Sequence, residues 1–234
     1  MLKNKQLAIT QFAKTISEAT ALQLQSSPVL APDQVLIKHA YIGINAIYDR
    51  ELYRGNIPYI SVAFPYVFGV EAVGVVMEVG SKVRHLVKGQ AVSTVKVGTA
   101  YQQYQMLQAN EAVKIPEATP EYLALNPTGV SAYLALKKVA ELQDGETIVV
   151  SAAAGGLGHL VVQLAKQKGC HVVGICGFEE KRTLLENLRA CDRIINYRSE
   201  DVATVLSKEY ANAIDVGFDS VGTTIFDAML PNMA

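Results

Sequence analysis

The segment IVVSAAAGGLGHLVVQLAK, residues 148–166, decides how this chain is expected to fold. It opens with a β-branched apolar run and closes with apolar residues at helical spacing, which predicts a strand, a tight turn and a helix. The turn carries Gly155 and Gly158 after Ala153, a GxGxxG spacing with alanine in the first position. This order of elements is typical of the first unit of a dinucleotide-binding sheet.

Each glycine of the turn has a physical purpose in that interpretation. Gly155 lets the backbone approach a pyrophosphate, and Gly158 lets the helix pack closely on the strand. The free N–H groups at the helix start then meet the anion. A purely structural βα turn also favours glycine, and this remains the alternative interpretation.

The second half of the chain repeats strand–helix units. Continuous apolar strands that alternate with amphipathic helices indicate a parallel α/β sheet with right-handed crossovers. Strands are predicted over 146–151, 170–175, 193–196 and 213–218, and helices over 129–142, 156–168, 179–189 and 201–209.

The first half is β-rich up to about residue 117. Short strands between turn signals predict a small barrel or sandwich. We therefore expect a β-barrel domain over residues 1–120 and a dinucleotide-binding domain over 121–234. Strands are predicted over 34–42, 70–79, 91–97 and 101–109, and residues 43–66 are expected to be irregular.

The second strand of the α/β half bears on the choice of nucleotide. An NAD site needs a carboxylate at the end of this strand to accept hydrogen bonds from the ribose 2′-OH. Glu179 and Glu180 follow the strand, but they fit the first turn of the next helix, where the dipole favours acids. Lys181 and Tyr197 would instead bind a 2′-phosphate, which favours NADP; a solvated helix face is the alternative for Lys181.

Composition excludes several classes of protein. With 21 Lys+Arg against 22 Asp+Glu and a net charge of −1, the chain offers no basic field for nucleic acid. Its apolar stretches are too short to cross a membrane. Three cysteines without CxxC spacing and an N-terminus without a secretory signal predict a reducing compartment, the cytoplasm or an organelle interior.

Ordered motifs along the whole chain resemble the medium-chain dehydrogenase/reductase superfamily. Within it, the chain is similar to the quinone oxidoreductase branch, and most to prostaglandin reductase 3-like enzymes. The resemblance implies a GroES-like β-barrel domain, a Rossmann domain and an active site in the cleft between them. The motifs are GINA (43–46), GVEAVGVVMEVG (69–80), KGQAV (88–92), GVSAY (129–133), AAAGGLG (152–158), CDRIINY (191–197) and DSVG (219–222).

The resemblance also implies roles for individual residues. Leu157 and Gly158 would contact the pyrophosphate through their backbone, and Ser220 would lie near the cofactor. Ser131 stands where relatives have threonine. Gly177 would border the 2′-phosphate together with Lys181 and Tyr197, although it replaces a serine and so removes one hydroxyl. The cofactor-binding set is thus Ser131, Gly155, Leu157, Gly158, Gly177, Lys181, Tyr197 and Ser220.

The implied reaction is hydride transfer from NADPH to an enone of the 15-keto prostaglandin type or to a quinone. Asn45 would face the nicotinamide and the substrate, and the Asn45 amide or a hydroxyl of Tyr48 or Tyr53 would stabilise the enolate oxygen. No metal is expected, because Val70 replaces the histidine of zinc-dependent relatives and no cysteine precedes Cys170. The sequence offers no evident acid–base pair in the 43–66 segment.

The chain shows four strands of an α/β sheet that normally has six. We therefore expect a C-terminally truncated Rossmann domain, and a homodimer only in the full-length form. The partner would be a small apolar carbonyl compound. The alternative function is an NADPH-binding protein with weak or no turnover.

Overall fold

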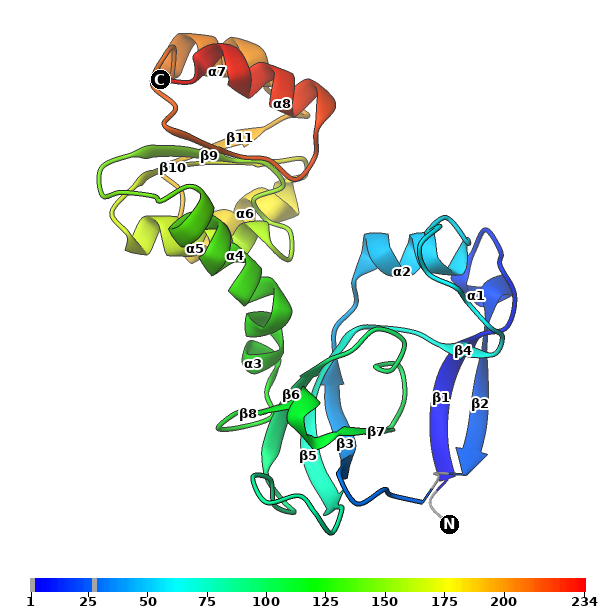
Figure 1. Ribbon diagram of the computed structural model, residues 1–234. Coiled ribbons are helices and arrows are strands. Elements are labelled where there is room, and N and C mark those ends of the chain that lie inside the picture. The colour runs from blue at the N-terminus through cyan, green and yellow to red at the C-terminus, as the bar shows by residue number, and fades with distance from the viewer. Residues whose placement is uncertain (1–2, 27–28) are drawn as a thin grey trace. The chain divides into compact units, whose positions relative to one another are not determined.

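The computed structural model describes residues 3–26 and 29–234 (Figure 1). The chain forms two compact units, Met1–Pro127 and Thr128–Ala234.

The first unit is built from two antiparallel sheets (Figure 1). The five-stranded sheet has the order β7-β3-β5-β6-β8, and the three-stranded sheet has the order β2-β1-β4. Val35, Ile37, Val76 and Leu107 form the core of the larger sheet. The strands are β1 (Lys3–Ile9), β2 (Thr20–Ser26), β3 (Gln34–Ile42), β4 (Tyr66–Val67), β5 (Glu71–Val79), β6 (Ala91–Val95), β7 (Tyr104–Gln108) and β8 (Ala112–Lys114).

Strand β1 turns polar side chains inward. Asn4 and Gln6 are buried, while Lys3 and Lys5 are exposed. The Asn4 Nδ2 donates to the Oε1 of Gln102 at 2.9 Å and to a main-chain carbonyl at 2.7 Å, so its burial is compensated.

Helix α2 corrects the expectation that residues 43–66 are irregular. Residues Ala46–Tyr53 form this helix, and the N–H of Asp49 donates to the carbonyl of Asn45 at 2.8 Å at its start. Only Asp49 and Leu52 of the helix are fully buried. Because one of them is an acid, the sequence shows no apolar helical period. The unit's other helical segments are α1 (Ile16–Ala19), the 3₁₀ turn η1 (Ala109–Glu111) and α3 (Pro120–Ala124). The π-helical turn η2 (Leu125–Gly129) begins in this unit and ends in the second.

The second unit is a parallel sheet with helices on both faces (Figure 1). Its strand order is β11-β10-β9-β12, the order of the first four strands of a Rossmann sheet. The helix predicted over 129–142 is present as α4 followed by the π-helical turn η3. The elements are α4 (Val130–Leu134), η3 (Ala135–Val139), β9 (Thr147–Val150), α5 (Gly158–Gln167), β10 (His171–Cys176), α6 (Glu179–Leu188), β11 (Arg193–Asn196), α7 (Val202–Glu209), β12 (Val216–Phe218), α8 (Thr223–Met229) and the 3₁₀ turn η4 (Leu230–Asn232).

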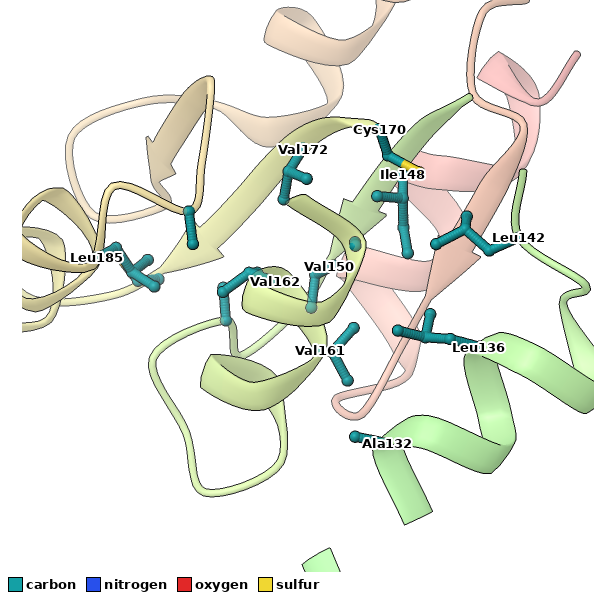
Figure 2. Packing of buried hydrophobic residues seen from close by; sticks show 14 residues of the cluster. Ala132, Leu136, Leu142, Ile148, Val150, Val161, Val162, Cys170, Val172 and Leu185 are labelled. Atoms are coloured by element: carbon teal, nitrogen blue, oxygen red, sulfur yellow. The ribbon is translucent and has the colours of Figure 1, made fainter. Parts of the chain in front are cut away.

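Two apolar cores lie on opposite faces of this sheet. Ile148 and Val150 of β9 face the core with α5, whereas Val149 faces the core with α7 and α8. Figure 2 shows the first core, in which Val161 and Val162 of α5 meet the strand side chains. Each such fully buried side chain contributes roughly 1.5–3 kcal/mol. The packing fixes where β9 ends and α5 begins.

Candidate functional site

A pocket of about 540 Å³ lies at the carboxyl ends of the parallel strands of the second unit. Its lining includes Gly155 after β9, Gly177 after β10, Tyr197 after β11 and Gly222 after β12. In sheets of this kind, ligands bind outside the carboxyl ends, where the strand order reverses. Here the order reverses between β9 and β12.

The glycine turn approaches this pocket closely. A Cβ atom at Gly158 would overlap the carbonyl oxygen of Ala152 and would lie 2.8 Å from the Cα of Ala153. At Gly155 a Cβ would lie 3.0 Å from the same carbonyl oxygen. The turn is therefore too tight for a side chain at Gly158 and leaves little room for one at Gly155. Helix α5 starts directly after it, and the positive end of the helix dipole suits an anion. The N–H groups of His159, Leu160 and Val161 already donate to the carbonyls of Gly155 and Leu157, so the free N–H groups expected at the helix start are engaged at these three positions.

A polar clamp joins the ends of β9 and β12. The buried Ser151 hydroxyl donates to Asp219 Oδ1 at 2.6 Å and accepts from the N–H of Ser220 at 2.7 Å. The N–H of Gly222 donates to Asp219 Oδ2 at 2.7 Å. Burial opposes ionisation of Asp219, but these hydrogen bonds outweigh it and hold its pKa below the ordinary value. The clamp thus fixes the backbone that leads from β12 to Val221 and Gly222, which line the pocket.

Two cations gather around Phe178, the residue before α6. The guanidinium of Arg198 lies 4.0 Å from the centre of the Phe178 ring, and the Lys181 Nζ lies 5.6 Å from it. Both distances are in the range of cation–π contacts. In the part of the chain that the structure describes, neither cation forms an ion pair with a carboxylate. Sequence reasoning missed Arg198, although its place directly after Tyr197 was a usable signal.

Tyr197 lies over Gly177. A Cβ atom at Gly177 would overlap the ring and hydroxyl of Tyr197. The tyrosine hydroxyl therefore occupies the space into which a serine at position 177 would project. The Tyr197 hydroxyl therefore lies at the end of β10, where the sequence predicted that glycine at position 177 removes the hydroxyl of a serine.

The acids near the pocket are either outside it or already engaged. Glu179 and Glu180 form the first turn of α6 and do not line the pocket. Glu200 lines it but binds Arg193 at 2.5 Å, which holds the pKa of Glu200 below its ordinary value. Asp201 accepts a hydrogen bond from a backbone N–H in α7 at 2.8 Å. None of these carboxylates follows β10 in the position that an NAD ribose requires.

The structure brings only part of the predicted cofactor set into the pocket. Gly155, Gly177, Lys181 and Tyr197 line it. The remaining predicted residues, which lie outside its lining, are Ser131 in α4, Leu157 before α5, Gly158 in α5 and Ser220 after β12.

In the first unit, Asn45 is held by two acids. It directly precedes α2, its backbone N–H donates to Asp49 Oδ2 at 3.0 Å, and its Nδ2 donates to Glu71 Oε1 at 3.1 Å. Tyr101 donates from its hydroxyl to the same Asp49 oxygen at 2.5 Å. A Cβ atom at Gly43 would overlap the Glu71 carboxyl group, so glycine there leaves room for this acid.

Both acids are buried, and both have raised pKa values. Asp49 is 4% exposed and Glu71 is 6% exposed. Burial raises the pKa of Asp49, against the lowering effect of its hydrogen bonds, and burial with the nearby Asp49 charge raises the pKa of Glu71. Sequence reasoning missed this pair. The isolated Glu71 inside the apolar stretch FGVEAVGVV (68–76) was a signal that could have indicated it.

The two candidate tyrosines lie on α2 in different surroundings. Tyr53 lines a groove of about 680 Å³ together with Asp49 and Tyr101. The Tyr48 hydroxyl is buried and has no hydrogen-bond partner among the residues that the structure describes. Burial raises the Tyr48 pKa, with a contribution from neighbouring tyrosines and Asp49. Tyr48 therefore stays a neutral hydroxyl at physiological pH.

The described residues contain neither a membrane-spanning helix nor a metal-ion cluster. Over residues 3–26 and 29–234, no helix is long and apolar enough to span a membrane. Over the same residues, no group of three or more His, Cys, Asp or Glu side chains has a geometry suited to a metal ion.

Family models match both units. Residues 31–117 match the model of the alcohol dehydrogenase GroES-like domain, and residues 156–234 match the model described as zinc-binding dehydrogenase. These matches and the strand order confirm the predicted fold class, a GroES-like domain with a Rossmann-type region.

Individual relatives cover nearly the whole chain. Prostaglandin reductase-3 of Mus musculus is 37% identical over 98% of this chain, which spans 60% of that protein. A probable quinone oxidoreductase of Schizosaccharomyces pombe is 32% identical over 95% of this chain and 67% of its own length. The crystal structure of Escherichia coli quinone oxidoreductase complexed with NADPH superposes with a TM-score of 0.82 at 26% identity, covering 98% of this chain and 70% of that one. The chain belongs to the medium-chain dehydrogenase/reductase superfamily, in its quinone oxidoreductase branch.

Proposed function

We propose that this chain is the NADPH-binding part of an oxidoreductase that reduces the activated C=C bond of an enone, or a quinone, without zinc. The observation that carries the proposal is the pair of cations around Phe178, Lys181 in α6 and Arg198 after β11, which form no ion pair with a carboxylate among the described residues. Relatives named for such reactions include (+)-pulegone reductase of Mentha piperita, 29% identical, and NADP(+)-dependent 2-alkenal reductase of Nicotiana tabacum, 41% identical over 47% of this chain.

The pocket of the second unit fits a dinucleotide phosphate. The N-terminal end of α5 would stabilise the pyrophosphate through the helix dipole, and Gly155, which lines the pocket, leaves space for its approach. Lys181 and Tyr197, which line the pocket, and Arg198, which lies outside the lining against Phe178, would bind the 2′-phosphate, because a dianion is best met by cations and hydroxyl donors. When bound, the nicotinamide supplies a hydride.

The chain's own residues would stabilise the charge that develops on the substrate. A carbonyl oxygen becomes an enolate when the β-carbon is reduced, and a neutral amide or hydroxyl lowers the energy of that charge. The Asn45 amide is fixed through Asp49 and Glu71, so it can donate its second N–H without further ordering. Tyr48 and Tyr53 are the candidate hydroxyls. We propose a small apolar carbonyl compound as the substrate.

The donor set supports a reaction without a metal. Val70 precedes Glu71 where zinc-dependent relatives have histidine, and the described residues offer no cluster of three metal-ligating side chains. Electrostatic stabilisation would then depend on Asn45 and the hydroxyls alone. We also propose that the whole protein forms a homodimer.

Calorimetry on the 234-residue chain tests the cofactor proposal. We expect 2′,5′-ADP to bind more tightly than 5′-AMP, and NADPH more tightly than NADH. Lys181→Ala and Arg198→Ala should each weaken 2′,5′-ADP by roughly tenfold, since a charge-assisted hydrogen bond contributes about 1.5 kcal/mol. Arg182→Ala is the matched control, because Arg182 is on the same helix and pairs with Glu186 at 3.0 Å.

Equal affinity for 2′,5′-ADP and 5′-AMP would contradict the NADPH assignment. NADPH consumption with a panel of enones and quinones tests the reaction itself. Selective NADPH binding without consumption of any of them would favour the alternative, a binding protein with weak or no turnover.

A further inference from the structure

The acidic pair of the first unit, Asp49 and Glu71, has hydrogen-bond donors for only part of its carboxyl oxygens. Asp49 Oδ2 receives both available donors, the Tyr101 hydroxyl and the backbone N–H of Asn45. Glu71 Oε1 receives the Nδ2 of Asn45. Among the described residues, Asp49 Oδ1 and Glu71 Oε2 are buried and have no hydrogen-bond partner.

Neighbouring cations do not compensate these carboxyl groups. Arg50, the next residue of α2, pairs with Glu51 at 2.7 Å, and Lys5 shares only the lining of the groove with Asp49. Within residues 3–26 and 29–234, no Lys, Arg or His lies within 4.0 Å of either carboxyl group.

The other titratable groups around the pair are phenols. Tyr101 donates to Asp49, and burial together with the two acids raises the pKa of Tyr101. Tyr48 lies near enough to Asp49 for its pKa to be affected by that charge. Neutral phenols provide donors but no positive charge. Two ionised carboxylates in this place would therefore repel each other without a counter-ion, and like charges at a buried site raise the pKa of one member strongly.

We propose that Asp49 and Glu71 hold a single proton between them at neutral pH, and that this singly charged pair positions Asn45 for the reaction. The proton occupies one of the two oxygens that no donor reaches, Asp49 Oδ1 or Glu71 Oε2. The pair titrates as a unit, so its apparent pKa belongs to both residues. Asp49 and Glu71 are positioning residues, since they act through Asn45.

The charge on the pair bears on the reaction, and this step rests on the proposed function. A singly charged pair anchors the backbone and the amide of Asn45 at once. Loss of the shared proton adds a second negative charge beside Asn45, where the enolate charge develops, and this repulsion raises the barrier. Reduction should therefore slow as the pH rises through the titration of the pair, by up to about tenfold per pH unit above its midpoint until it reaches the rate of the doubly charged form.

Carboxyl-carbon and amide-nitrogen NMR of the whole chain tests the proton directly. We expect a titration of Asp49 and Glu71 with a midpoint well above the ordinary values of about 3.9 and 4.3, and a shift of the Asn45 side-chain amide at the same midpoint. Glu71→Gln should abolish this shift. Glu78→Gln is the control, since Glu78 is exposed on the same strand.

The outcomes separate the inference from the proposed function. The inference would be overturned if both carboxyl groups titrated at ordinary pKa values, or if the chemical shift of the Asn45 amide did not change at their midpoint. The wild-type titration decides this even if Glu71→Gln does not fold. Enone reduction by the wild-type chain without an alkaline decline would overturn the link to the reaction. Absence of any reduction would count against the proposed function, while the NMR midpoint would still decide whether the pair holds its proton.

Discussion

A matched pair of glycine substitutions tests the tight turn before α5. In Gly158→Ala the new methyl group would overlap the Ala152 carbonyl oxygen and lie 2.8 Å from the Cα of Ala153 and 2.9 Å from the carbonyl carbon of Ala152. These are backbone atoms of a turn held by neighbouring strands, so the helix must shift. In Gly156→Ala, two positions earlier, a Cβ atom would meet nothing within 4 Å.

Only the substitution at Gly158 is expected to destabilise the fold. Overpacking typically costs about 1–3 kcal/mol. Alanine at a helix position recovers up to about 1 kcal/mol. Gly158→Ala should therefore lose roughly 1–2 kcal/mol of unfolding free energy, which for a unit of about 100 residues lowers Tm by several degrees. Gly156→Ala should be neutral, or gain about 0.4–1 kcal/mol by restricting the unfolded chain.

Urea and thermal unfolding followed by circular dichroism measure the difference, and calorimetry with 2′,5′-ADP measures its effect on the pocket. We expect Gly158→Ala to weaken binding and Gly156→Ala to leave the fold intact. If the two variants were equally stable, the close approach of α5 to the turn would not be the constraint that the structure indicates. The reasoning would also be refuted by a Gly158→Ala variant that unfolds like the wild type.

Three further predictions concern polar groups. Ser151→Ala should cost about 1–3 kcal/mol of unfolding free energy in urea titrations, because it removes a buried hydroxyl that donates to the Asp219 carboxylate and accepts from the N–H of Ser220. An unchanged midpoint would show that the clamp is not stabilising. Gly177→Ser should displace the Tyr197 ring, visible as a changed tyrosine NMR signal, and should alter 2′,5′-ADP affinity. Because the pKa values of Asp49 and Glu71 are raised on folding, the folded state binds more protons than the unfolded state above about pH 4. The contribution of the two acids to stability is therefore fully present below that pH. It is lost as the pH rises through the pKa values of the folded state. The difference in unfolding free energy between the wild type and Glu71→Gln should therefore change across this pH range.

The α/β half could be predicted well because each of its elements has an apolar pattern. The strand Arg193–Asn196 was predicted with the bounds that the structure shows, and the helix 179–189 ends one residue earlier in α6. Parallel strands are buried on both faces, so their apolar runs are continuous and easily recognised. The same periodicity placed Gly155 and Tyr197 after strand ends and Lys181 in the helix that follows β10.

The elements that sequence reasoning missed are those with polar residues inside. Strand β1 buries Asn4 and Gln6, and β2 exposes Leu22 and Leu24, so neither shows the alternation of a half-buried strand. Helix α2 and the acidic pair were missed because Asp49 is buried. Burial of a polar side chain depends on partners that are distant in the chain, such as Tyr101 for Asp49, and a local pattern cannot supply them.

The buried amide side chains of β1 also determine the register in which this strand pairs with β2. A slip of β1 by one residue against β2 would turn Lys3 and Lys5 inward and leave the partners of Asn4 without an amide. Burying unpaired lysines costs far more than the amides contribute, so the misaligned pairing is disfavoured. The polar strand therefore specifies a single register, which an apolar strand of alternating valines would enforce less strictly.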